Sequence, residues 1–205
     1  MMKDKLKFKK LLNEFRSLEA EFAYNTEVLV DARETFQCSY LQWCEENGVD
    51  IKELEEQRSK QVVFTKPPVE IKDSYERIEV KEKPTQHKEV FKSVAKKIHP
   101  DKLSTTDPRK DEFKSAFQKA ANAMLESQWG ELFDIIDKYQ IDIPDYDEAN
   151  SSLEQDINRM ESKLKKQKST YAWLLEDCGD DQVCKDRVIS LFLRHAYNWD
   201  GIKRP

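Results

Sequence analysis

The chain has 205 residues and a formal net charge of −5; 37% of its residues are charged, 38% are hydrophobic and only four are glycine. This profile is typical of an elongated helical protein and disfavours an enzyme built on a β-sheet. No stretch approaches the ~20 apolar residues of a membrane span, and the start lacks the apolar core of a signal peptide, so we expect a cytoplasmic protein. The composition predicts the all-α class. The negative net charge disfavours nucleic-acid binding by the whole protein.

Residues 1–60 predict a long helical arm. From about Lys3 to Asn47, apolar side chains recur at alternating four- and three-residue steps, interrupted at Asn25 and Ser39. The members of this stripe are Leu11, Phe15, Leu18, Phe22, Leu29, Ala32, Phe36 and Trp43. A helix of ~40 residues is ~60 Å long and cannot bury such a stripe on itself, so we expect a coiled coil or a long hairpin. The sequence ENG at 46–48 predicts its end, and a short helix follows at about Ile51–Gln57.

Residues 61–85 predict an extended linker. Three prolines and the local alternation of Val69 with Ile71, and of Ile78 with Val80, favour extended chain over helix. A small hairpin and a degenerate helix are the two alternatives for this segment.

Residues 86–145 predict a compact helical head. Thr85 can cap a helix from about Gln86 to Ile98, and Asp107 with Pro108 predicts the start of a second helix. A third, short helix follows Gly130, and residues 141–150 form an acidic connector. The side chains expected to face inward on the three helices are Phe91, Val94, Ala95, Ile98, Phe113, Ala116, Phe117, Ala120, Met124, Leu132, Ile135, Ile136 and Tyr139.

Residues 146–205 predict a C-terminal helical arm. A capping box at Ser151 to Glu154 opens a heptad helix that extends to Leu174, the sequence CGDD at 178–181 ends it, and a final helix extends to about Tyr197. We expect these helices to pack on the long N-terminal helix. Homodimerisation through the N-terminal helix is the competing arrangement.

The four cysteines have neither metal-site spacing nor the density of a disulfide framework, so we expect reduced thiols. Cys178 and Cys184 could nevertheless meet across the bend between the last two helices. His99 and Asp101 could form an acid–base pair, but no nucleophile, phosphate-binding glycine loop or metal cluster accompanies them. We therefore expect no enzymatic activity, no cofactor and no metal site.

The sequence His99-Pro100-Asp101 lies between the first two helices of the head. Pro100 cannot continue a helix and disfavours a helical conformation at His99, so the chain must turn there and display Asp101. Lysines follow one outward face of the preceding helix at four-residue intervals, with two more close by: Lys88, Lys92, Lys96, Lys97 and Lys102. The tripeptide could be a simple helix stop, and a lysine stripe is usually only a solvated helix face.

The segments FKSVAKKIHPDKLS (91–104) and FKSAFQKAANAM (113–124) resemble the J-domain of the DnaJ, or Hsp40, co-chaperone family. The family pattern before the tripeptide is aromatic–Lys–x–aliphatic–Ala–x–Lys–aromatic, and here Phe91 to Ile98 follows it, ending in isoleucine. The resemblance covers about 40 of the 205 residues. The family's first helix, with its Tyr–x–x–Leu–Gly signature, is matched only in part, by SYERIEV at 74–80.

The resemblance implies a function that composition alone does not. In the family, the aspartate of this tripeptide pairs with an arginine of Hsp70 and stimulates ATP hydrolysis. It implies an Hsp70-binding site made of His99, Pro100, Asp101, Lys88, Lys92, Lys96, Lys97 and Lys102. The chain lacks the Gly/Phe-rich linker and the CxxCxGxG repeats of general Hsp40 proteins, so we expect a dedicated adaptor whose arms hold one client. A virus-encoded adaptor is one form of this hypothesis. The alternatives are a coiled-coil scaffold with a J-like head inactive on Hsp70 and a nucleic-acid binder that uses the lysine helix; we do not expect the latter.

Overall fold

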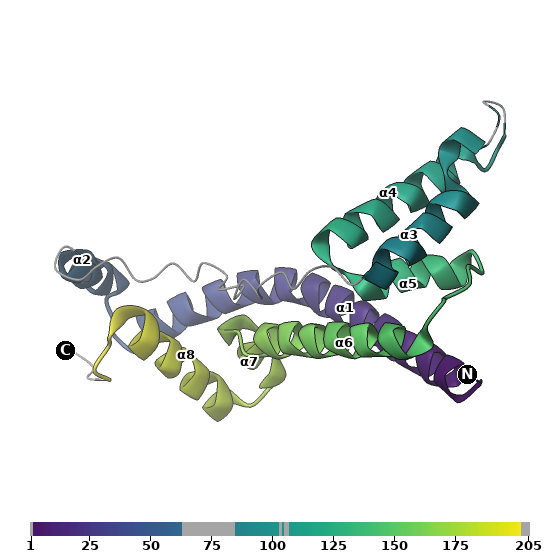
Figure 1. Ribbon diagram of the computed structural model, residues 1–205. Coiled ribbons are helices and arrows are strands. Elements are labelled where there is room, and N and C mark those ends of the chain that lie inside the picture. Colours follow the sequence, from purple (N-terminus) through teal and green to yellow (C-terminus); the bar gives the residue numbers. More distant parts are fainter. Residues whose placement is uncertain (1, 63–84, 103, 105–106, 202–205) are drawn as a thin grey trace. The chain divides into compact units, whose positions relative to one another are not determined.

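The computed structural model describes residues 2–62, 85–102, 104 and 107–201, and no strand occurs among them (Figure 1). The all-α class is therefore confirmed. The elements are α1 (Met2–Glu46), α2 (Ile51–Val62), α3 (Thr85–Ile98), the 3₁₀ turn η1 (Pro100–Lys102), α4 (Lys110–Glu126), α5 (Trp129–Lys138), α6 (Tyr146–Lys168), α7 (Tyr171–Asp177) and α8 (Gln182–Tyr197). Most of the linker predicted at 61–85, including the segment 74–80, lies outside the described residues; residues 61 and 62 belong to α2, and residue 85 opens α3.

The contacts within the chain form two compact units. The first unit combines Met1–Glu21 with Arg77–Ser162, and the second combines Phe22–Glu76 with Lys163–Pro205. These units differ from the segments predicted at 1–60, 61–85, 86–145 and 146–205, because the long helices α1 and α6 each contribute residues to both units.

The long helix predicted at the N-terminus is confirmed as α1, which has 45 residues and ends at Glu46 just before Gly48. Its apolar stripe is buried by several shorter helices within each unit. Phe8 and Phe15 belong to the core of the first unit, whereas Leu29 and Phe36 belong to the core of the second. The burial of so long a stripe therefore does not depend on a single long partner helix.

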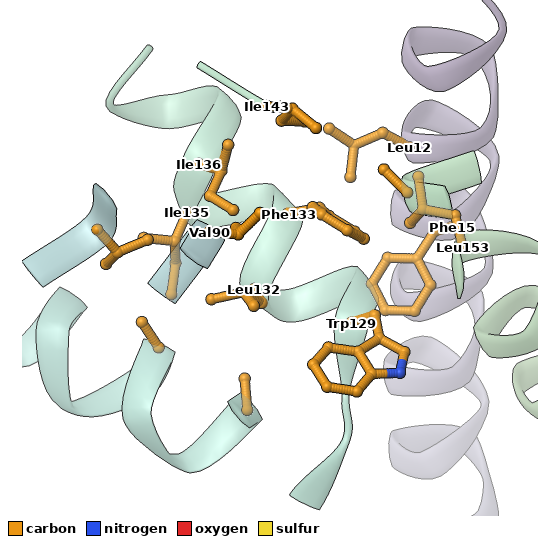
Figure 2. Packing of buried hydrophobic residues seen from close by; sticks show 14 of the residues in the cluster. Leu12, Phe15, Val90, Trp129, Leu132, Phe133, Ile135, Ile136, Ile143 and Leu153 are labelled. Atoms are coloured by element: carbon orange, nitrogen blue, oxygen red, sulfur yellow. The ribbon is translucent and has the colours of Figure 1, made fainter. Parts of the chain in front are cut away.

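The core of the first unit is built on α5. Its members include Phe15 of α1, Val94 of α3, Ala120 of α4, Phe133 of α5 and Leu153 of α6, and Figure 2 shows α5 side chains between α1 and the other helices. The alanines on α4 are small, so the backbones of neighbouring helices can approach one another closely.

Gly130 of α5 lies where only a glycine fits. A Cβ built on this residue would lie 2.4 Å from the Phe15 ring, far inside van der Waals contact. The same helix is tied to α1 by Arg16, whose guanidinium donates to Asp134 at 2.6 Å and to Asp137 at 2.9 Å. These contacts join two segments of the first unit that are more than a hundred residues apart in the chain.

Two predicted helix starts were wrong. α4 begins at Lys110, two residues after Pro108, because residues 107–110 first form a turn: the Asp107 carboxylate accepts the Arg109 N–H at 2.9 Å and the Asp107 carbonyl accepts the Lys110 N–H at 3.0 Å. α6 begins at Tyr146, inside the predicted acidic connector. Its cap is Asp145, whose carboxylate accepts the Asp147 N–H at 2.8 Å. The predicted capping box at 151–154 therefore lies inside α6.

The second unit packs α7 and α8 on the C-terminal half of α1, as predicted. Phe36 and Phe192 meet edge to face at 4.9 Å between ring centroids, and the Trp43 indole N–H donates to Asp186 at 3.0 Å. The predicted heptad helix does not continue through this region. It ends at Lys168, and the Thr170 hydroxyl accepts the backbone N–H of Trp173 to start α7.

The expectation of four reduced thiols was wrong for two of the cysteines. Cys178 and Cys184 form a disulfide, because the end of α7 and the first turn of α8 bring their Cα atoms to 5.6 Å. Cys38 and Cys44 are free thiols, as expected. None of the helices in the described part of the chain has the length and apolar character needed to cross a membrane.

Candidate partner-binding site

The loop at His99-Pro100-Asp101 closes the end of α3. The His99 N–H still donates to the Ala95 carbonyl at 3.2 Å, and the Lys102 N–H then donates to the His99 carbonyl at 3.1 Å. Pro100 has no N–H to continue the helical ladder, so the chain tightens into η1. The predicted helix stop is thus a single 3₁₀ turn that packs against α4.

The His99 side chain is held in place by α4. Its ring lies edge-on to the Phe117 ring, with 4.8 Å between centroids, and Phe117 in turn packs against Phe91 of α3 at 5.7 Å. Ile98, the residue before His99, is fully buried in the core of the first unit. The base of the loop is therefore anchored by apolar and aromatic contacts from both helices.

Asp101 lies at the exposed tip of the turn. Its side chain is 88% exposed, compared with 37% for His99. The Asp101 N–H lies 3.3 Å from His99 Nδ1, so the backbone of the turn contacts the imidazole ring. The Asp101 carboxylate lies 3.6 Å from the same nitrogen and is otherwise open to solvent.

The five candidate lysines are all exposed. Lys88, Lys92 and Lys96 follow one face of α3 at four-residue intervals, so their ammonium groups form a stripe that leads to the loop. The Lys102 ammonium folds back and donates to the Lys96 carbonyl, where it satisfies one of the acceptors left free at the end of α3. All eight predicted site residues thus lie within the first unit: four on α3, three on η1, and His99 between the two elements.

α5 supports the pair of helices α3 and α4 through contacts with α4. Tyr139, directly after α5, packs its ring against Phe113 of α4 at 5.4 Å and donates its hydroxyl to Glu112 at 2.9 Å. Lys138 adds an ion pair to the same carboxylate at 2.9 Å. Within the described residues, α4 is therefore supported by α5, which is in turn held by the first half of α1.

Sequence reasoning missed the residues that position the loop. Phe117 was expected to face inward, but its contact with His99 had no local signal, because the two residues lie on different helices. Arg16 lies on the polar side of its helix, and its two partners are more than a hundred residues away. The three-residue spacing of Asp134 and Asp137 places two carboxylates on one helix face, which is a weak signal of a basic partner.

Comparisons of the chain with models of known protein families, with curated proteins and with solved structures find no match in any of the three. The described residues also contain no group of three or more histidine, cysteine, aspartate and glutamate side chains that could hold a metal ion. What the site can do chemically therefore follows from its own geometry: it presents one exposed carboxylate on a 3₁₀ turn beside a row of exposed lysines.

Proposed function

We propose that this chain is a cytoplasmic J-domain co-chaperone, which stimulates ATP hydrolysis by an Hsp70 (DnaK-type) chaperone and delivers a specific client through its helical arms. The observation that carries the proposal is the Asp101 carboxylate, 88% exposed on a turn whose base is anchored by His99 and Phe117. An arginine of the partner can reach so exposed a carboxylate from solvent. The fixed turn gives that bond a direction as well as energy.

The lysine stripe supports the same proposal through association kinetics. Exposed cations on Lys88, Lys92 and Lys96 raise the local concentration of an acidic partner surface near the loop. Such charges act mainly on the rate of encounter, and their effect falls as salt screens them. The stripe therefore steers the partner, and the carboxylate orients it.

The test is single-turnover ATP hydrolysis by a DnaK-type Hsp70 in the presence of the full chain. A charge-assisted hydrogen bond contributes ~1.5–3 kcal/mol, so Asp101→Asn is expected to lower the stimulation by roughly tenfold or more. Asp111→Asn is the matched control, because Asp111 is an exposed aspartate on α4 of the same unit. If neither the wild type nor the control raises the rate above that of Hsp70 alone, the proposal is wrong.

An interaction scaffold without activity on Hsp70 is the second candidate. The second unit has its own core and carries half-buried aromatic rings from three helices, including Tyr40, Tyr171 and Phe192. Aromatic side chains of this kind dominate protein interfaces. A scaffold of this type predicts that His99→Gln is silent in a pull-down, whereas Phe192→Ala weakens partner capture. For a co-chaperone, His99→Gln abolishes ATPase stimulation.

A further inference from the structure

We infer that the Cys178–Cys184 pair is a reversible thiol–disulfide exchange site, opened by an external dithiol and closed by the corresponding disulfide. The bond joins α7 to α8 across a sequence separation of six residues. The inference does not depend on the proposed function, because every cysteine of the chain lies in the second unit and the loop at 99–101 lies in the first. Opening the bond is expected to loosen the second unit alone.

The pair lies at an accessible corner of the second unit. Cys178 occupies the C-cap position of α7 and Cys184 lies in the first turn of α8, while Gly179, Asp180 and Asp181 between them are exposed. A Cβ built on Gly179 would meet no atom within 4 Å, so the space beside the turn is open. A reductant can therefore approach the bond without unfolding either helix.

Accessibility decides which sulfur is attacked. Cys178 is buried, whereas Cys184 is half-buried, so a thiolate of the dithiol attacks Cys184 Sγ. The S–S bond breaks, its electron pair leaves on Cys178 Sγ, and that thiolate takes a proton from solvent. The second thiolate of the reductant then attacks the reductant sulfur that is bonded to Cys184. This closes the disulfide of the reductant and releases the Cys184 thiolate, which takes the second proton. Two electrons and two protons pass to the protein, and the dithiol becomes a disulfide.

After reduction, the Cys178 and Cys184 thiols can keep their positions at the ends of α7 and α8. Cys178 Sγ lies 3.2 Å from the Leu174 carbonyl oxygen. A disulfide sulfur has no hydrogen to donate, but the released thiol has one and can donate it to this acceptor. The cap of α8 also survives, because the Asp181 carboxylate accepts the backbone N–H of Cys184 at 3.1 Å and not its sulfur. Both states therefore fit the same helix termini, and the exchange is reversible.

The other two cysteines do not compete for the exchange. Cys44 is 1% exposed, and burial raises the pKa of its thiol to about 11, so almost none of it is the reactive thiolate. Cys38 is exposed but is not joined to either member of the pair. A single short-range disulfide beside two free thiols is unlike the dense framework of a secreted domain and fits a transient, redox-responsive bond.

The bond clamps part of the second core. α7 contributes Ala172 and Leu175 to this core, and α8 contributes Val188 and Ile189 close to the crosslink. Removing a crosslink increases the conformational freedom of the unfolded chain more than that of the folded one, which destabilises the fold. The redox state of the pair thus changes the stability of the arm that would hold a client, and leaves the first unit as it was.

The first experiment determines the state of each cysteine. The full chain is equilibrated with mixtures of oxidised and reduced dithiothreitol, quenched with acid and alkylated in denaturant, and its peptides are identified by mass spectrometry. We expect Cys178 and Cys184 to become alkylated together in a two-electron transition, in the wild type and equally in Cys38→Ser/Cys44→Ser. Full alkylation of both residues at every mixture, or linkage of either to Cys38, would overturn the inference.

The second experiment measures the consequence. Reduction is expected to lower the thermal midpoint of the second unit by roughly 5–10 °C, while amide protection in α3 and α4 stays the same. Cys178→Ser/Cys184→Ser should melt at the midpoint of the reduced wild type and show no response to dithiothreitol. An unchanged midpoint on reduction of the wild type, or an equal loss of protection in α3 and α4, contradicts the inference.

Discussion

Asp156 of α6 is a carboxylate that the first unit buries almost completely, with 6% of the residue exposed. Its oxygens accept the Gly130 N–H at 2.7 Å and pair with the Arg159 guanidinium, so it holds the start of α5 against α6. Burial raises the pKa of the Asp156 carboxyl above its usual value, although these two partners oppose the shift. Asp156 therefore anchors the start of α5, although burial disfavours its ionised form.

This shift predicts the sign of a pH dependence. The folded state holds the Asp156 proton more tightly than the unfolded chain does, so its contribution to the free energy of unfolding is largest below the usual aspartate pKa of about 4 and falls as the pH rises through the folded-state pKa. In Asp156→Asn, which cannot ionise, the free energy of unfolding of the first unit should fall less steeply from about pH 4 upward. Urea unfolding at several pH values, followed by NMR of the α5 amides, measures this.

Glu161→Gln is the control for the pH series, because Glu161 is exposed on the same helix and belongs to the same unit. It should follow the wild-type pH dependence. An identical slope in Asp156→Asn and the wild type would mean that the buried carboxylate does not titrate differently in the two states.

At the scale of the elements, the contact between α3 and α4 turns a helix end into a shaped loop. Pro100 ends the helix by its own chemistry, but the direction of the turn depends on Phe117, which lies on the other helix and packs against His99. The loop is thus shaped jointly by one local and one long-range cause. We therefore expect both to position the Asp101 carboxylate.

Phe117→Ala tests the role of this ring. Removing it takes away the edge-on contact with His99 and that with Phe91, and aromatic pairs of this kind contribute about 0.5–1.5 kcal/mol beyond their burial. We expect weaker stimulation of Hsp70 and a shift of the His99 ring signals in NMR, with the helices intact by circular dichroism. Phe117→Tyr, which retains the ring, should restore both. Wild-type stimulation by a folded Phe117→Ala would show that the loop does not need the ring.

At the scale of the whole molecule, two cores share the long helix α1 but no core residue. The first cluster takes its α1 side chains from Phe8 to Leu18, and the second takes its own from Leu29 to Cys44. Each cluster is completed by segments distant in sequence, which explains why boundaries placed in order along the chain differ from the two units.

Separate cores predict separate effects of core truncation. Ile136→Ala removes a fully buried side chain from the first core and Leu193→Ala does so in the second, and each should cost about 2–5 kcal/mol. Hydrogen exchange followed by mass spectrometry should show faster opening of α3 to α5 in Ile136→Ala and of α7 and α8 in Leu193→Ala. Equal loss of protection in both units, from either variant, would show that the cores unfold as one.

Local signals in the sequence predicted the long N-terminal helix and the candidate loop. The apolar stripe predicted α1, the ENG sequence predicted its end, and Pro100 between two amphipathic helices predicted a turn with Asp101 at its tip. These features depend on residues within a few positions of one another, so the sequence by itself determined them. Two helix starts were wrong: Asp145 caps α6 ahead of the expected capping box, and a turn at the expected Asp107 delays the start of α4 to Lys110.

Only the tertiary structure decided which residues support the loop and how the chain divides. The contact of His99 with Phe117, the ion pairs of Arg16 with α5 and the Cys178–Cys184 bond all depend on how helices meet. Such meetings are set by side-chain packing between segments up to more than a hundred residues apart, for which periodicity and capping rules carry no information. The sequence alone thus predicted a carboxylate displayed on a turn, and the packing of α3, α4 and α5 is what holds that turn in place.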